Sequence, residues 1–168
     1  EGQAIAWEHL GELFQREGKT VEAEDAYRRH TELRKRKNEC DLHRKAVGLD
    51  KDGKLLERSG KLDEAAQKYF ESLEIRNKID DKSGQIYSLS HIGDVFTRQR
   101  RWEEAESAYK ESIKICHDVG NDRKQAATIY NLGKLYQAQG QFVEAEAEYK
   151  QSLEMRKNVI DPKGEALT

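Results

Sequence analysis

The chain has 168 residues, of which 36% are hydrophobic and 37% charged, with a formal net charge of −2. This composition fits an elongated helical architecture with a thin core better than one compact globule. The balanced charge and the lack of a 20-residue apolar run disfavour nucleic acid and membrane as partners, and we expect a cytoplasmic protein with Cys40 and Cys116 reduced.

Three stretches of the chain share one pattern. They read "WEHLGELFQREGKTVEAEDAYRRH" from Trp7, "LSHIGDVFTRQRRWEEAESAYKES" from Leu89 and "IYNLGKLYQAQGQFVEAEAEYKQS" from Ile129. Each has a glycine, an aromatic residue three positions later, an alanine nine further on and a tyrosine four after that. In chain order these are Gly11, Phe14, Ala23 and Tyr27; Gly93, Phe96, Ala105 and Tyr109; and Gly133, Tyr136, Ala145 and Tyr149. The chain is therefore built from repeats.

A further copy lies between the first two. Gly11 and Gly93 are 82 residues apart, about twice the 40 that separate Gly93 from Gly133. Ala65 and Tyr69 supply the second half of this copy, and counting back assigns Gly53 as its glycine. The end of the chain, "KGEALT", matches "SGQIYS" and "EGQAIA". We expect repeats at about 4–43, 46–83, 86–123 and 126–163, with 164–168 beginning a fifth, so that residues 1–168 are one segment of a longer array.

The pattern W-x2-L-G-x2-Y followed by A-x3-F/Y resembles the tetratricopeptide repeat, a helix-turn-helix unit. The period of about 40 exceeds the usual 34, and the extra residues follow the tyrosine, as in "LEIRNKIDDKSG". This is similar to the lengthened repeats of kinesin light chains, receptor-coupled polarity adaptors and many prokaryotic signalling proteins. The resemblance implies an all-α fold: an α-solenoid of antiparallel helix pairs in a right-handed superhelix, here with eight helices and a stub.

The repeated glycines predict close helix packing. A glycine inside a helix costs about 1 kcal/mol relative to alanine, so its recurrence needs a structural reason such as a tightly crossing partner helix. Apolar residues at i, i+4 spacing would fill the layer between helices. They are Leu10, Phe14, Ile92, Phe96, Leu132 and Tyr136. We interpret these residues as core and not as a cofactor site.

In the resembling family, the first helix of each repeat lines a concave groove. Carried over to helices beginning at Ala4, Ala46, Ile86 and Ala126, this implies a partner-binding groove. Its residues are His9, Glu12, Arg16, Lys51, Lys54, Arg58, Tyr87, His91, Asp94, Arg98, Tyr130, Asn131 and Lys134. Arg16, Arg58 and Arg98 occupy one position in successive repeats and would form a ladder that binds carboxylates. The alternative is that these are only solvated polar positions.

The resemblance implies a protein–protein interaction scaffold that binds an extended or helical segment of another protein. Glu8, Glu12, Asp50 and Asp94 would also face the groove, so we expect a partner of mixed charge. The alternative function is self-association, or a sensor or regulatory arm of a larger signalling protein. Association through exposed ends of the array is a further expectation.

The stretch "GLDKDGKLLERSG" at 48–60 has superficial likeness to two ligand loops. As a phosphate loop it lacks a preceding strand and has Leu55 where a hydroxyl should bind magnesium. As a calcium loop it has too few acids, and Glu57 comes too early. We interpret it as a degenerate repeat, with Asp52 at a core position, and expect its helix to be shortened or bent near Gly48 to Gly53.

No other catalytic or ligand-binding motif stands out. H-E-x-x-H, G-x-S-x-G and paired-cysteine spacings are absent from the sequence, and Cys40 and His43 form only a lone C-x-x-H. The basic run "RRHTELRKRKNECDLHRK" could contact phosphates, but it fits better as the solvated end of a long second helix. We therefore expect no enzyme, no cofactor and no metal, and we consider nucleic acid an unlikely partner.

Overall fold

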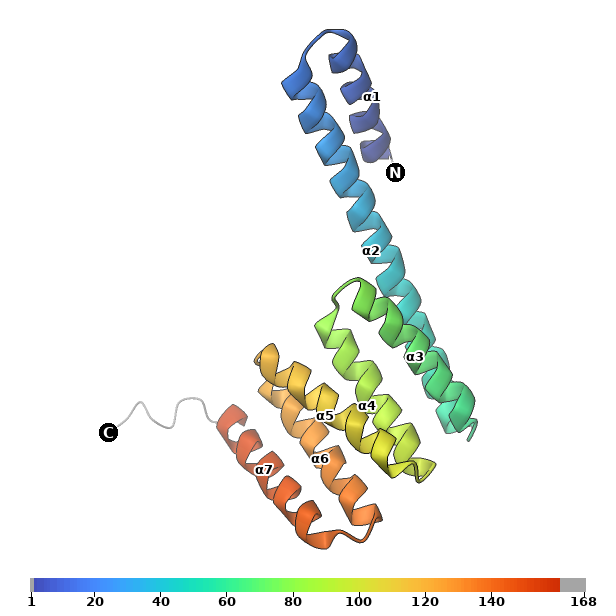
Figure 1. Ribbon diagram of the computed structural model, residues 1–168, viewed down its shortest axis with the longest axis vertical. Helices are drawn as coiled ribbons and strands as arrows, with labels where there is room; N and C mark the ends of the chain where they lie inside the picture. Colours follow the sequence, from blue (N-terminus) through green and yellow to red (C-terminus); the bar gives the residue numbers. More distant parts are fainter. Residues whose placement is uncertain (1, 161–168) are drawn as a thin grey trace, which may run out of the picture. The chain divides into compact units, whose positions relative to one another are not determined.

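The computed structural model describes residues 2–160, and this part of the chain consists of helices joined by short turns, without a strand. The helices are α1 (Gly2–Arg16), α2 (Thr20–Arg58), α3 (Leu62–Lys78), α4 (Lys82–Arg98), α5 (Trp102–Asp118), α6 (Asp122–Ala138) and α7 (Phe142–Ile160) (Figure 1). They group into two compact units, which are divided between Arg44 and Lys45. The all-α prediction is confirmed, whereas the start of the proposed fifth repeat lies outside the described residues.

The expectation of eight helices is wrong, because residues 2–160 form seven. Helix α2 runs without interruption from Thr20 to Arg58 and combines the second helix of the first repeat with the first helix of the second repeat. The proposed boundary between residues 43 and 46 therefore coincides with no break in secondary structure. Gly48 and Gly53 both lie inside this helix, so the predicted shortening near them is also wrong.

The regular junctions show why α2 continues. Between α3 and α4, Asp80 has a φ of 53°, and Asp81 caps the next helix by accepting a hydrogen bond from the Gly84 N–H at 2.9 Å. Between α5 and α6, Gly120 has a φ of 65° and Asn121 caps through the Lys124 N–H at 3.1 Å. In α2 the corresponding positions are Asn38 and Glu39 when counted from Tyr27, and Cys40 and Asp41 when counted back from Gly53, because the first repeat is two residues longer. In the first pair glutamate is a poor N-cap, and in the second pair cysteine does not favour a positive φ. Neither pair supplies both features of a turn, and the surrounding residues favour helix.

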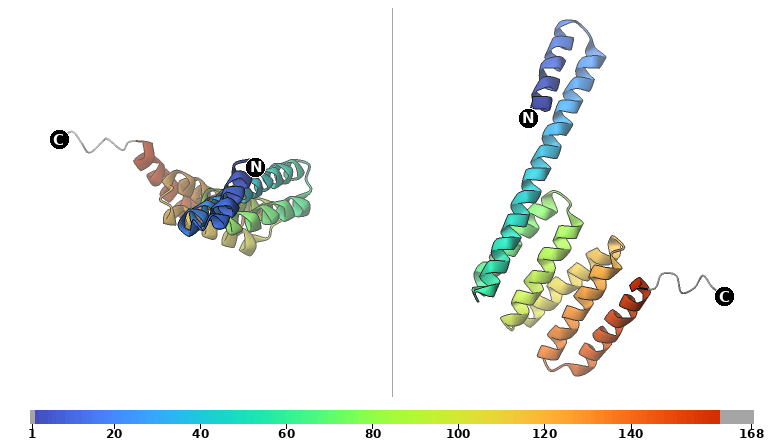
Figure 2. Two further views of the ribbon diagram at one scale, coloured as in Figure 1. Left: turned by 90° about the horizontal axis from the view of Figure 1, so that it is seen from above. Right: turned by 180° about the vertical axis from the view of Figure 1, so that it is seen from behind.

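Helices α3 to α7 form a regular stack of antiparallel neighbours (Figures 1 and 2). Helices α3 and α5 lie on the side that faces the viewer in Figure 1, and α4 and α6 lie on the side that faces the viewer in the right-hand view of Figure 2. Within this stack, each repeat of the sequence pattern corresponds to one pair of helices. The tetratricopeptide-like α-solenoid expected from the resemblance is present here.

The glycine of every repeat packs against the tyrosine sixteen residues later. A Cβ added at Gly11 would lie 2.7 Å from Tyr27, at Gly53 2.9 Å from Tyr69, at Gly93 2.5 Å from Tyr109 and at Gly133 2.8 Å from Tyr149. A real side chain would not fit at these distances. The glycines therefore make room for the tyrosine ring of the paired helix, and the assignment of Gly53 to the second repeat is confirmed.

A second contact also recurs in every repeat, 26 residues apart. Ser72, Ser112 and Ser152 donate hydrogen bonds to the carbonyl groups of Ala46 at 3.1 Å, Ile86 at 3.4 Å and Ala126 at 2.7 Å, respectively. In the first repeat the Nδ1 of His30 lies 2.8 Å from the Ala4 carbonyl oxygen. This contact ties the second helix of each repeat to the beginning of the first and supports one common register.

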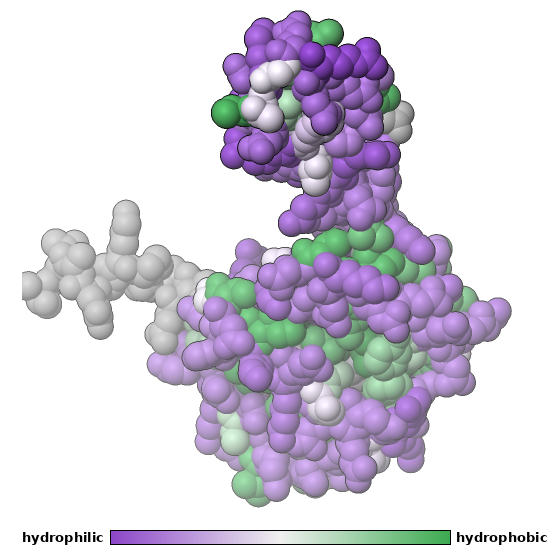
Figure 3. Space-filling model, turned by 45° about the horizontal axis from the view of Figure 1, so that its top comes forward, coloured by the Kyte–Doolittle hydropathy of each residue, from purple (hydrophilic) through white to green (hydrophobic). Residues whose placement is uncertain are grey.

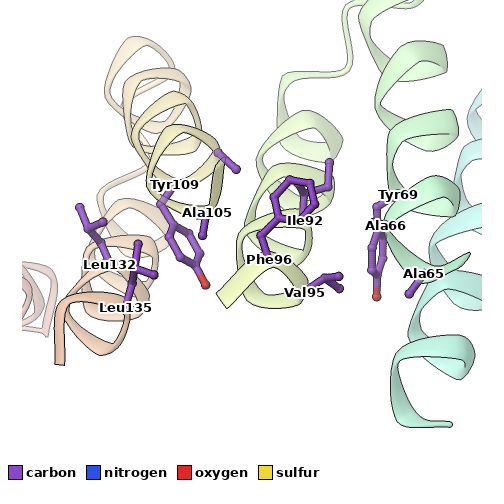
Figure 4. Packing of buried hydrophobic residues seen from close by; sticks show 11 residues of the cluster. Ala65, Ala66, Tyr69, Ile92, Val95, Phe96, Ala105, Tyr109, Leu132 and Leu135 are labelled. Atoms are coloured by element: carbon purple, nitrogen blue, oxygen red, sulfur yellow. The ribbon is translucent and has the colours of Figure 1, made fainter. Parts of the chain in front are cut away.

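The main core lies between α3 and α6. Figure 4 shows Ile92 and Phe96 of α4 between Tyr69 of α3 and Tyr109 of α5, with Leu132 of α6 beyond. Among the predicted core residues, Ile92, Phe96 and Leu132 are buried, and Phe14 and Tyr136 are half-buried. Leu10 is 37% exposed and is a correction to the prediction. Its counterparts Ile92 and Leu132 belong to the core cluster, together with residues of α3 and α5, the helices that precede theirs.

Candidate partner-binding surface

The predicted groove residues divide between the two compact units. His9, Glu12 and Arg16 lie on α1 in the first unit, where His9 approaches Glu12 at 3.6 Å. The other ten lie in the second unit on α2, α4 and α6. We call these ten the α2–α4–α6 surface: Lys51, Lys54, Arg58, Tyr87, His91, Asp94, Arg98, Tyr130, Asn131 and Lys134.

His91 occupies the middle of this surface and packs between two tyrosine rings. Its ring stacks on Tyr69, with centroids 5.0 Å apart, and lies tilted against Tyr87 at 4.5 Å. Its Nδ1 is 3.7 Å from Glu57 Oε2 and 3.9 Å from Asp94 Oδ2, which is too far for a hydrogen bond. This nitrogen therefore has no hydrogen-bond partner among the described residues. The rings hold the histidine in place while the nitrogen keeps its bonding capacity.

The two carboxylates beside His91 are held by groups of the protein itself. Glu57 accepts hydrogen bonds from the Tyr69 hydroxyl at 3.2 Å and from Arg98 at 3.4 Å. Asp94 accepts a hydrogen bond from the Tyr109 hydroxyl at 2.6 Å. Burial raises the pKa of Asp94 above its usual value, although the Tyr109 hydroxyl opposes this effect. Both carboxylates are therefore already hydrogen-bonded to side chains of the protein.

Glu57 is a site residue that the sequence reasoning missed. A signal for it exists, because in three of the four repeats the tyrosine bonds the side chain twelve residues before it. Tyr27 donates to Gln15 at 3.2 Å, Tyr69 to Glu57 at 3.2 Å and Tyr149 to Gln137 at 2.7 Å. Comparing these positions across the repeats would have identified Glu57 as an acceptor beneath the surface.

The cations of the surface are more open than its acids. Lys51, Lys54, Arg58 and Lys134 are exposed, and so are the rings of Tyr87 and Tyr130. The guanidinium of Arg156 lies 5.5 Å from the centroid of the Tyr130 ring, which also contacts Tyr149. The surface therefore presents cations, aromatic rings and hydrogen-bond donors to solvent.

The three arginines of the predicted ladder lie in three different environments. Arg98 donates to the Glu57 carbonyl at 3.1 Å and thereby links α4 to α2. Arg58 is exposed at the end of α2. Arg16 lies in the first unit, where it ends α1. The ladder as a ligand-binding feature stays a prediction.

Asp50 was expected to face the groove, and this is wrong. Its side chain is buried in an ion pair with Arg76 Nη2. Arg76 also donates to Ser72 at 3.0 Å and to Asp81 at 3.0 Å, and Ser88 donates to Asp50 at 3.2 Å. The expected core position Asp52 is exposed instead. A buried polar network therefore replaces apolar packing where α2, α3 and α4 meet.

The described part of the chain has neither a metal-ligand cluster nor a membrane-spanning helix. No group of three histidine, cysteine or acidic side chains in residues 2–160 is arranged to hold a metal ion. Over the same residues, none of the helices has the length and apolar character to cross a membrane.

Comparison with known proteins identifies the repeats. Models of the tetratricopeptide repeat match residues 6–41 and residues 84–158. No curated protein sequence matches the chain.

Several solved structures share the fold. BtubC (BKLC) from P. vanneervenii is 19% identical, with 93% of this chain and 64% of that chain covered and a TM-score of 0.64. The TPR domain of Arabidopsis FLU is 16% identical, with 70% and 98% covered and a TM-score of 0.65. A kinesin light chain protein of Podosopora anserina with nearly identical TPR-like repeats is 16% identical, with 93% and 76% covered and a TM-score of 0.59.

The chain thus spans less than two thirds of BtubC. At these identities the likeness concerns the fold, and it agrees with the two repeat matches and with the recurring glycine–tyrosine contacts. The chain belongs to the tetratricopeptide repeat family, and its repeats resemble those of kinesin light chains.

Proposed function

We propose that this protein is an interaction scaffold whose α2–α4–α6 surface binds a segment of another protein. Tetratricopeptide repeats generally mediate protein–protein interaction and typically serve as non-catalytic scaffolds. The observation that carries the proposal is that the acidic side chains of this surface are hydrogen-bonded within the protein, whereas its basic side chains are exposed to solvent. Glu57 and Asp94 are bonded within the wall, whereas Lys51, Lys54, Arg58 and Lys134 are exposed.

This arrangement favours a partner segment that carries carboxylates and apolar side chains. The burial of Asp50 removes one of the acids that had been expected on the surface. Tyr87 and Tyr130 are exposed and would contact apolar side chains of the segment. Because the helices are already ordered, the partner would bear most of the ordering cost of binding. This partner differs from the mixed-charge partner expected from the sequence, because Asp50 is buried and Asp94 is bonded to Tyr109.

A peptide library displayed on phage and selected on the full chain tests this function. We expect selected peptides to be enriched in Asp and Glu, since cations are the open charges of the surface. Lys51→Glu combined with Arg58→Glu should weaken their binding by about tenfold or more, which corresponds to at least 1.4 kcal/mol. The measurement is fluorescence anisotropy with one labelled peptide of the selected set.

A matched control is Lys114→Glu combined with Lys150→Glu, because these two exposed lysines lie on α5 and α7 and carry the same charge change. Circular dichroism should be unchanged in both double variants. If both bind the selected peptides equally, or if the selected peptides lack acidic residues, the assignment of the surface fails.

The second candidate function, self-association, is supported by a different observation. Phe142, Val143 and Leu153 of α7 are exposed. Phe142 and Leu153 correspond to Leu62 and Leu73 of α3, which pack against the core. We infer that this α7 face can pair with another helix, including one from a second copy. Sedimentation velocity distinguishes the two functions: concentration-dependent dimers that Phe142→Ser and Leu153→Ser abolish would favour self-association through this face.

A further inference from the structure

The second unit has another hollow surface, on the face of α4 that points away from the α2–α4–α6 surface. At 3.6 residues per turn, Leu89, Ile92 and Phe96 lie on the side of α4 opposite His91 and Arg98. These three residues form the floor of a hollow of about 720 Å³ between α3 and α5. We call it the α3–α5 groove. In Figure 3, hydrophobic residues gather on the α3–α7 part on the side that faces the viewer in Figure 1, and hydrophilic residues surround them.

The α3 wall of the groove departs from the repeat pattern. In α5 and α7 the corresponding positions carry ion pairs, Glu106 with Lys110 and Glu146 with Lys150, each at 2.6 Å. The first repeat has Glu24 and Arg28 at these positions. Only α3 has an alanine and a phenylalanine there, Ala66 and Phe70, and both line the groove.

Phe70 is therefore an exposed aromatic residue at a position where the other three repeats have a cation. It is 43% exposed, and its ring lies 6.0 Å from that of Phe96 on the groove floor. Replacing a solvated ion pair with an apolar pair gives a soluble protein more exposed apolar area, and such contiguous area marks interaction sites. The fold does not require the replacement, because α5 and α7 adopt the same helix with the ion pair.

The α5 wall supplies negative charge. Glu103, Glu104 and Glu111 line the groove, and Asp63 lies at the end of the α3 wall. Glu104 is neutralised by Arg101, whose guanidinium bonds it at 2.8 Å and covers the Phe96 ring at 4.1 Å. Among residues 2–160 no cation forms an ion pair with Glu103 or Glu111. The groove thus has an apolar floor and one acidic edge.

The shape and polarity of the groove select a helix as its occupant. Its lining runs on α3 from Asp63 to Leu73, a rise of ten residue steps, which at 1.5 Å each is about 15 Å or nearly three helical turns. An extended peptide would place unpaired N–H and C=O groups on the apolar floor, whereas a helix satisfies them internally. The acidic edge complements cations on one flank of that helix.

We propose that the α3–α5 groove binds an amphipathic helix of a partner protein that carries apolar residues at i, i+3 or i+4 and i+7 and Lys or Arg along one flank. This is a second interaction surface of the scaffold, and it does not depend on the α2–α4–α6 surface. Phe70 inserts between the apolar residues of the helix, and Glu103 and Glu111 pair with its cations. Two partners could then occupy the two faces of α4 at the same time.

Two designed 18-residue helical peptides test the proposal on the full chain. Both carry the same leucine stripe, and they differ only in having Lys or Glu on one flank. Fluorescence anisotropy should show the Lys peptide binding about tenfold or more tightly than the Glu peptide at low salt, with the difference shrinking as salt rises. Phe70→Lys, which restores the residue type of the other repeats, should abolish binding of the Lys peptide.

Charge reversal on the groove is the more decisive test. Glu103 and Glu111 are exposed, so their substitution should leave the fold intact. Glu103→Lys with Glu111→Lys should reverse the preference, so that the Glu peptide binds more tightly. The matched control, Lys54→Glu on the opposite face of the stack, should change neither affinity by more than about twofold. An unreversed preference, or binding that Phe70→Lys leaves intact, overturns the proposal. A dimer of the chain alone that Phe70→Lys dissociates would assign the groove to a second copy instead and also overturn it.

Discussion

The junction between α3 and α4 and the middle of α2 occupy equivalent places in successive repeats, yet only the first is a turn. At the α3–α4 junction, Asp80 adopts a positive φ and Asp81 caps α4, while the buried Arg76 bonds Asp81 from the last turn of α3. In α2 the equivalent residues are helical, whether they are counted from Tyr27 (Asn38 and Glu39) or back from Gly53 (Cys40 and Asp41).

The difference shows how few residues decide whether two repeats fold back on each other. The α5–α6 junction turns without a buried arginine, because Cys116 replaces Arg76 and Lys124 replaces Gly84. What the two turning junctions share is a residue at positive φ followed by an Asp or Asn cap. The cap and the left-handed residue are thus the common requirement, and the ion pair is an addition specific to α3 and α4.

The largest expected effect concerns the network of the α3–α4 junction. Asp50→Ala should lower the free energy of unfolding by about 3 kcal/mol, because the buried Arg76 would keep only Asp81 as an anionic partner. Urea denaturation followed by circular dichroism measures the loss. Asp52→Ala is the control and should change stability by less than about 0.5 kcal/mol, since that side chain is exposed. Equal losses in the two variants would mean that Asp50 is not the buried acid.

The two glycines Gly84 and Gly48 should respond to alanine in opposite directions. A Cβ at Gly84 would fall on the buried guanidinium of Arg76, so Gly84→Ala should destabilise by about 2 kcal/mol. A Cβ at Gly48 would meet nothing within 4 Å, and Gly48→Ala should stabilise α2 by about 0.5–1 kcal/mol. Thermal unfolding of both variants provides the comparison. A destabilising Gly48→Ala would indicate that α2 is bent or interrupted there.

Grafting the residues of the α5–α6 junction into α2 should convert part of the continuous helix into a turn. Asn38→Gly with Glu39→Asn copies Gly120 and Asn121 and should cost about 1 kcal/mol in a continuous helix. Hydrogen exchange measured by mass spectrometry should show protected amides at 38–44 in the natural chain and faster exchange there in the graft. Residues 79–81 serve as the internal reference for a turn. Fast exchange at 38–44 before grafting would contradict an uninterrupted α2.

The two thiols should also differ between the middle of α2 and the helix end before a regular junction, and this difference in reactivity is the smallest expected effect. Cys116 lies in the last turn of α5 and is buried, whereas Cys40 lies in the middle of α2 and is exposed. Burial raises the pKa of the Cys116 thiol, so iodoacetamide should modify Cys40 at least about tenfold faster near neutral pH.

The raised pKa of Cys116 also gives the sign of a pH effect. The stability it contributes is complete below the ordinary thiol pKa of 9.0 and falls as pH rises above it, because the unfolded chain ionises first. In Cys116→Ala this part of the decline above about pH 9 should be absent. Rapid labelling of Cys116 in the folded chain would refute its burial.

Sequence comparison among the repeats predicted much of the fold. The glycine–tyrosine spacing located all four repeats, including the one at Gly53 that lacks the usual neighbours, because this contact needs a missing Cβ at a fixed distance along the chain. Asp50 could not be placed in the same way. Its burial depends on Arg76, which lies 26 residues later in another helix and has no equivalent in the third repeat.

The proposed partner-binding residues were predicted by position but not by environment. Tyr87, His91 and Tyr130 lie on the expected helices, as the period of a helix requires. Whether a charge is open or engaged depends on neighbouring helices, as shown by Arg98 bonding Glu57 of α2. The α3–α5 groove was missed because a single phenylalanine in a charged helix carries no periodic signal.

The sequence by itself determined the repeat, its helical type and its family, since these follow from short-range spacing and from the need to accommodate a tyrosine at each glycine. Only the tertiary structure decided which faces of the helices are covered. Leu55 is 62% exposed, whereas its counterparts Val95 and Leu135 are fully buried. Burial of an apolar residue in such an array comes from the adjoining repeat, and identical positions in the pattern therefore have different environments.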